Sequence, residues 1–152
     1  MQTARQLRML GIVGVAMLLA TGCASGVSGR GISVKDAMAR PSPLEGGTGG
    51  AFLTIVNNGP EPDHLLSASS PAAGAIELHE TVDDNGVMRM VPHPEGWEIP
   101  ALGTLELKPG GKHLMLIKLA RPLEAGQTVQ ITLTFRNAGP VTVRVPIKLM
   151  SE

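Results

Sequence analysis

The 152-residue chain has one cysteine, three aromatic residues and no tyrosine. Its 13 basic and 13 acidic residues cancel, whereas proteins that bind nucleic acids usually carry a basic excess. Single-stranded nucleic acids are also commonly bound by stacking bases on aromatic side chains, which are scarce here. These shortages argue against a nucleic-acid partner.

Long helices and a permanent membrane span are also disfavoured. The chain has 19 Gly and 12 Pro, two residues that destabilise helix interiors. The apolar stretch Met9–Ala20 has 12 residues, which is too short to cross a bilayer comfortably as a lasting helix. Eight Met and four His stand against these shortages and need an explanation.

The amino terminus has the features of a targeting segment. Arg5 and Arg8 precede the apolar stretch, and Leu19-Ala20-Thr21-Gly22-Cys23 ends it. This ending resembles a bacterial lipobox, with Ala20 where Leu is commoner. The resemblance implies a lipoprotein signal peptide over residues 1–22 and a lipidated Cys23, whose acyl chains would anchor the protein firmly. An ordinary secretory signal that happens to contain a Cys is the alternative.

The remaining chain divides into a tether and one domain. Residues 23–31 are small and polar and predict a flexible tether, followed by a domain over residues 32–152. A lipidated Cys23 leaves this domain without a thiol, and an exported domain of this size can fold without disulfides. The Pro- and Gly-rich segment 38–50 predicts a crossing loop, with Met38 in a loop or short helical turn.

Short apolar segments separated by turn signals predict an all-β domain. The clearest are Val129–Phe135 and Val141–Val145, in which apolar and polar residues alternate, and Asn137-Ala138-Gly139-Pro140 supplies the turn between them. Further strands are expected at 52–56, 75–79, 87–91, 97–100, 104–107 and 113–117. Seven to nine short strands without a long amphipathic helix predict an antiparallel Greek-key β-sandwich.

Two groups of metal-binding side chains stand out. His113 and Met115 are two residues apart in a predicted strand, so they share a face. The turn Asp83-Asp84-Asn85-Gly86 should fold the strand that ends at His79 onto the strand that carries Met88 and Met90. Imidazole and thioether together form a soft, neutral donor set that suits Cu(I), whereas structural zinc prefers thiolates and calcium prefers oxygens.

Ordinary roles for these residue types remain open at this point. A Met in a strand is usually core filler, and an isolated His is usually a hydrogen-bonded surface residue. We expect such roles for His64, His93, Met38 and Met150. Strand geometry alone does not choose between Met88 and Met90.

The mature domain resembles the PCuAC-type periplasmic copper chaperones from about Val34 to Ile147. Four segments carry the resemblance: residues 51–59 (AFLTIVNNG), 77–80 (ELHE), 86–90 (GVMRM) and 107–116 (LKPGGKHLML). The ligand pattern of the family is a His, ten residues, a Met, about twenty-one residues and His-x-Met. Here ten residues separate His79 from Met90, and twenty-two separate Met90 from His113, which Met115 follows. The resemblance therefore selects Met90 over Met88.

The resemblance implies a cupredoxin-like β-barrel or sandwich that binds one Cu(I) per chain through His79, Met90, His113 and Met115. It also implies a monomer that delivers copper to the binuclear copper centre of cytochrome c oxidase, with the copper-bearing oxidase subunit and a thioredoxin-like assembly factor as partners. The protein would then be a membrane-anchored bacterial lipoprotein facing the periplasm or the cell exterior. Phe52 stands where Tyr is common in the family.

Two alternatives to delivery remain. The same site could serve copper sequestration or resistance, or the chain could be a metal-free structural lipoprotein with a sandwich fold. An enzyme is disfavoured because the sequence shows no Ser/His/Asp or Cys/His arrangement. A mononuclear electron-transfer cupredoxin needs a thiolate ligand, and the mature chain has none to offer.

Overall fold

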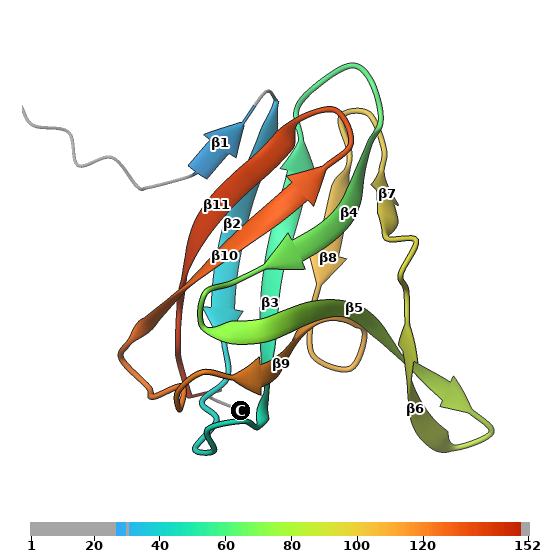
Figure 1. Ribbon diagram of the computed structural model, residues 1–152. Coiled ribbons are helices and arrows are strands. Elements are labelled where there is room, and N and C mark those ends of the chain that lie inside the picture. Colours follow the sequence, from blue (N-terminus) through green and yellow to red (C-terminus); the bar gives the residue numbers. More distant parts are fainter. Residues whose placement is uncertain (1–26, 30, 150–152) are drawn as a thin grey trace, which may run out of the picture.

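A computed structural model describes residues 27–29 and 31–149 of the chain, and these form an all-β barrel (Figure 1). The strands are β1 (Val27–Gly29), β2 (Ile32–Ala39), β3 (Thr48–Asn57), β4 (Asp63–Ser69), β5 (Ala73–Asp84), β6 (Val87–Pro92), β7 (Trp97–Ile99), β8 (Thr104–Leu107), β9 (Lys112–Leu119), β10 (Thr128–Phe135) and β11 (Gly139–Pro146). The predicted signal peptide and Cys23 lie outside the described residues. Within the described ranges, no helix is long and apolar enough to cross a membrane.

The strands form one antiparallel sheet in the order β1-β2-β3-β9-β5-β4-β10-β11, with β6, β7 and β8 as side branches. Its two ends approach where β2 runs beside β11, and a single parallel bridge between Ala39 and Ile147 joins them. The sheet is thus a nearly closed barrel. The predicted all-β, antiparallel, cupredoxin-like class is confirmed.

Alternating apolar residues build the interior of the barrel. In β10 and β11 the inward row contains Val129, Ile131, Leu133, Phe135, Val141, Val143 and Val145, all buried. The sequence predicts these two strands correctly, and the three residues after Phe135 form the turn, with Gly139 at φ 74°. A three-residue loop followed by a left-handed Gly is a common hairpin geometry.

Three details differ from the predictions. Met38 lies in β2 opposite Phe52, not in a loop or helical turn. The sequence does not reveal this strand because a bulge with Asp36 at φ 54° interrupts the alternation of apolar and polar residues. The crossing loop is therefore shorter than predicted. Residues 27–29, expected in the tether, pair with β2 through a turn in which Gly31 has φ 89°.

The strand β4 has no counterpart among the predicted segments. It begins at Asp63, whose buried carboxylate accepts hydrogen bonds from the backbone N–H groups of Asn137 and Ala138, each at 2.9 Å. A buried Asp at the start of a strand breaks the apolar pattern, so composition hides the element. Asp63 instead satisfies polar backbone groups in the β10–β11 turn.

Candidate metal centre

The hairpin formed by β5 and β6 carries the first two candidate donors. Its two-residue turn places Asn85 at φ 56° and Gly86 at φ 85°, and Asp84 pairs with Val87 across it. Positive φ at both central positions defines a type I′ turn, which matches the twist of a hairpin. The predicted turn is confirmed, and the hairpin projects from the barrel in Figure 1.

Strand register brings the candidate donors to one face. His79 lies directly opposite His113 on β9, and Thr81 lies opposite Met90 on β6. Residues opposite each other in antiparallel strands share a face, as do residues two apart in one strand. His79, Met90, His113 and Met115 therefore lie on the same face of the three strands β6, β5 and β9.

The other face of β5 and β9 packs into the barrel. Leu78 and Leu114 pair with each other and are 6% and 0% exposed. Shifting either strand by one residue would send these leucines to solvent and the histidines to the core, so burial strongly specifies the register. The packing of the core thereby fixes the position of the histidines.

The two imidazole rings are close enough to share one ion. Their centroids are 6.0 Å apart with an interplanar angle of 67°. His113 is only 7% exposed, and the ring of Phe52 lies 6.3 Å from it. An open cavity of about 350 Å³ is lined by Met90, His113 and Met115, and His79 adjoins it through its contact with His113.

Hydrogen bonds leave one free nitrogen on each ring. His113 donates from Nδ1 to the carbonyl oxygen of Gly111 at 2.9 Å, which leaves the lone pair on Nε2. His79 donates from Nε2 to the carboxylate of Glu77 at 2.8 Å. Its Nδ1 is buried and has no hydrogen-bond partner. Metal-binding histidines usually donate their other N–H to a carbonyl or carboxylate in this way.

The chemistry of the donor set fits Cu(I). Two neutral imidazoles and two thioethers are soft ligands without charge. Among the described residues, no three His, Cys, Asp or Glu side chains are grouped so that they could hold a metal ion. The His and Met side chains on this face suit a soft cation, because thioethers coordinate soft cations.

The other two histidines have different surroundings. His64 Nε2 lies 2.8 Å from the carbonyl oxygen of Glu95, and His93 contacts Glu95 at 2.8 Å and Glu80 at 3.2 Å. A hydrogen bond from the backbone of Glu95 itself, followed by the one from His93, lowers the pKa of the Glu95 carboxyl group. Neither histidine lines the cavity of the four candidate donors. Met150 lies outside the described residues.

Sequence reasoning missed several residues that surround the donors. Glu77 is two residues before His79, so the two-residue period of a strand could have placed it on the same face. Phe52 and Thr81 line the cavity, as does Arg40, whose guanidinium lies 5.8 Å from the centre of the Phe52 ring. Phe52 and Arg40 come from distant segments, and no local pattern points to them.

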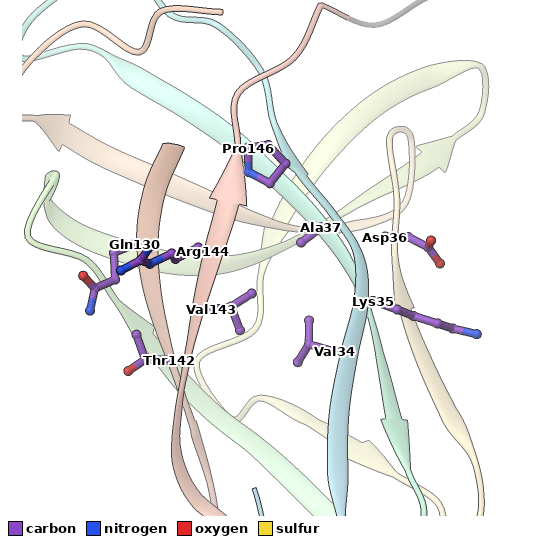
Figure 2. Close-up of a pocket in the computed structure, with 9 residues that line it drawn as sticks. All are labelled: Val34, Lys35, Asp36, Ala37, Gln130, Thr142, Val143, Arg144 and Pro146. Atoms are coloured by element: carbon purple, nitrogen blue, oxygen red, sulfur yellow. The ribbon is translucent and has the colours of Figure 1, made fainter. Parts of the chain in front are cut away.

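A larger cavity of about 650 Å³ lies elsewhere, at the seam between β2 and β11 (Figure 2). Figure 2 shows Val34 and Val143 pointing into this seam, whereas Lys35 and Asp36 point away from it. None of the four candidate donors lines it. The larger cavity therefore lacks the candidate donors. The candidate metal centre is identified by its His and Met side chains and not by the volume of its cavity.

The family model described as "LpqE-like: Putative lipoprotein LpqE-like" matches residues 32–147. The chain is 38% identical over 141 residues to "Putative lipoprotein Lxx21020" of Leifsonia xyli subsp. xyli, covering 92% of this chain and 84% of that protein.

Two solved structures have a similar fold. The copper-bound PCuAC domain from PmoF2 is 22% identical with a TM-score of 0.68, over 83% of this chain and 99% of that domain, which shows the shared fold. The Cu(I) form of DR1885 from Deinococcus radiodurans is 32% identical with a TM-score of 0.55, over 76% of this chain and 78% of that protein.

Proposed function

The chain belongs to the LpqE-like lipoprotein family and has the PCuAC fold, and from this premise we propose that it is a Cu(I) chaperone outside the cytoplasm. It binds one Cu(I) through His79, Met90, His113 and Met115. It is a transfer protein and not an enzyme, since copper enters and leaves as Cu(I) and only its ligands change.

A single observation supports this proposal: by strand register the four side chains share one face of β6, β5 and β9. Three of them, Met90, His113 and Met115, line one cavity, and the ring of His79 lies beside that of His113. The similarity to structures described as copper-bound and Cu(I)-bound gives independent support. The ligand spacing read from the sequence selects the same four residues. A metal-free structural role does not require two His and two Met side chains on one face of the barrel.

Exposure of the donors is graded in a way that suits transfer. His113 is 7% exposed, whereas Met90 is 59% exposed on a strand with no buried residue. A ligand on an open strand can leave the ion first, while the two histidines still hold it against the barrel. An incoming ligand from a receiving protein can then replace Met90 without unfolding the site.

We further propose that the receiver is the binuclear copper centre of cytochrome c oxidase, reached together with a thioredoxin-like assembly factor. A lipid on Cys23 would hold the domain at the membrane that contains the oxidase. The lipoprotein names of the matching family and relative support this anchor. Lipoprotein signal processing would place the domain in the periplasm or at the cell exterior.

The copper site is tested by anaerobic titration of the detergent-solubilised full chain with Cu(I) against a competing Cu(I) chelator. We expect one tightly bound ion and near-complete loss when His113→Ala and Met115→Leu are combined. The matched control combines His64→Ala with Met38→Leu, which changes the same residue types at positions that do not line the cavity. Equal affinity in the two double variants would refute the site assignment.

Delivery is tested separately from binding. The Cu(I)-loaded chain is mixed anaerobically with the copper-free oxidase subunit, the two proteins are separated after set times, and the copper bound to each is measured. Transfer at a rate that exceeds spontaneous release to a chelator supports a chaperone. Tight binding without transfer, with or without the assembly factor, would favour sequestration instead.

The anchor is tested by labelling cells with a radioactive fatty acid. We expect the label on the wild-type chain and none after Cys23→Ala, which should also leave the uncleaved precursor. An unlabelled wild-type chain would favour an ordinary secretory signal.

A further inference from the structure

Glu77 is the acidic residue whose side chain contacts the ring of His79. It lies on β5 two residues before His79, on the same outer face, and opposite Met115 on β9. Its Oε2 is 2.8 Å from Nε2 of His79. The residue thus contacts one candidate ligand directly and pairs across the strands with another.

The hydrogen bond determines the proton position on the His79 ring. A carboxylate can only accept, so the N–H of a neutral His79 is on Nε2 and the lone pair is on Nδ1. That Nδ1 is buried and has no partner. A buried acceptor without a partner is costly, and an ion bound at this atom would remove the cost.

His113 has the opposite arrangement. Its Nδ1–H donates to the carbonyl oxygen of Gly111, so its Nε2 holds the lone pair. Because Gly111 accepts through its backbone, a side-chain substitution there does not remove this bond. The Glu77 carboxylate is therefore the ring partner that mutagenesis can delete.

The carboxylate also balances charge. Two imidazoles and two thioethers are neutral, so Cu(I) leaves a net charge of +1 on the centre. Glu77 is the acidic group in direct contact with a candidate ligand ring, and its side chain is 52% exposed. Water therefore weakens its long-range field, and its main influence passes through the hydrogen bond to the ring.

We propose that Glu77 is a positioning residue for Cu(I), which holds His79 in the tautomer that binds the ion through Nδ1, while His113 binds through Nε2. This role rests on the proposed copper function. Removing such a partner of a metal ligand typically weakens metal affinity by about 10- to 100-fold.

Glu80 provides a matched control on the same strand. It is adjacent to His79, but its carboxylate contacts His93 at 3.2 Å and Lys112 at 3.8 Å, and no contact joins it to a candidate ligand ring. Glu77→Gln and Glu80→Gln remove the same charge close to the centre. Only Glu77→Gln changes the partner of the His79 ring.

The experiment measures Cu(I) affinity by chelator competition and the ring nitrogens of His79 by long-range 1H–15N NMR, on the full chain in detergent. We expect the metal-free wild type to show the Nε2–H tautomer of His79, and Cu(I) to shift its Nδ1 resonance. Affinity should fall about 10- to 100-fold in Glu77→Ala, by less in Glu77→Gln, and hardly at all in Glu80→Gln. Thermal unfolding confirms that each variant is folded.

Two results would overturn the role of Glu77 alone. One is a tightly binding wild type whose affinity does not fall in Glu77→Ala, which leaves His79 Nε2 without this acceptor, any more than it falls in Glu80→Gln. The other is a shift of Nε2 instead of Nδ1 of His79 on adding Cu(I). A wild-type chain that binds no Cu(I) would instead overturn the proposed function, and the positioning role with it.

Discussion

Two hairpins of the same barrel use apolar residues in opposite ways. The hairpin of β10 and β11 buries its inward row completely, from Val129 at one end to Val145 at the other. The hairpin of β5 and β6 also carries apolar residues on its second strand, but every residue of β6 is exposed. Met88 and Met90 are 61% and 59% exposed.

The difference follows from what each hairpin packs against. Both edges of β10 are paired, one with β4 and the other with β11, and its apolar row faces the core. Strand β6 pairs only with β5 among the described strands and stands away from the barrel (Figure 1). An apolar side chain with no core to fill is available for binding instead.

The largest expected effect comes from a truncation in the β10–β11 hairpin. Phe135→Ala should lower the free energy of unfolding by about 3–5 kcal/mol, because Phe135 is fully buried and leaves a large cavity. Val91→Ala, on exposed β6, should stay within about 0.5 kcal/mol of the wild type. Urea denaturation followed by circular dichroism measures both, and similar losses would contradict the proposed contrast.

The next effect separates binding from stability within the β5–β6 hairpin. Met90→Leu should weaken Cu(I) affinity at least tenfold, or by about 1.4 kcal/mol, because leucine keeps the volume but has no sulfur. Met88→Leu should leave affinity unchanged, and neither variant should change the urea midpoint. Equal losses of affinity in the two variants would show that Met88 contributes to binding as much as Met90, and no loss in Met90→Leu would show that Met88 can replace it.

Alanine substitutions at two glycines, one in each hairpin turn, test how far backbone strain at each turn lowers the free energy of unfolding. Gly86 has φ 85° and Gly139 has φ 74°, and an added methyl would meet nothing within 4 Å at either site. Gly139→Ala should therefore lower the unfolding free energy by about 1 kcal/mol through backbone strain alone.

Gly86→Ala should have a smaller global effect, because the tip of the projecting hairpin can open while the barrel stays folded. Its strain should appear instead as faster amide hydrogen exchange in β6. Equal global losses, without faster exchange in β6, would mean that the hairpin unfolds only together with the barrel.

The smallest expected effect concerns an exposed ion pair on the β5–β6 hairpin. Arg89 Nε lies 3.1 Å from the Asp84 carboxylate, and both side chains are largely in solvent. Arg89→Gln should change the free energy of unfolding by less than about 0.5 kcal/mol, and added salt should abolish the difference. A larger change that persists in high salt would show that this hairpin contributes to global stability.

Much of the fold could be predicted from local patterns. Alternation identified β10 and β11, and the Asp83-Asp84-Asn85-Gly86 sequence identified the hairpin turn because only a few residues tolerate two consecutive positive φ angles. Alternation failed where the backbone departs from regularity. The bulge at Asp36 hid β2 with Met38, and the buried Asp63 hid β4.

The candidate site was predictable to a lesser degree. Spacing placed His113 beside Met115, and the turn placed His79 near Met90 or Met88. The resemblance in ligand spacing, and not strand geometry, chose between the two methionines. The contact of Glu77 with His79 lay within reach of the two-residue period, whereas Phe52 and Arg40 reach the cavity from the distant segment around β3.

The sequence by itself therefore determined the regular strands, the hairpin turns and which residues share a face within a strand, because these depend on local backbone preferences and on the two-residue period. Only the tertiary structure decided that β9 lies beside β5, with His113 directly opposite His79. The two strands are joined by a long connection that carries no pairing signal. Their register is specified by the burial of Leu78 against Leu114, which depends on the assembled barrel and brings the candidate ligands together on its outer face.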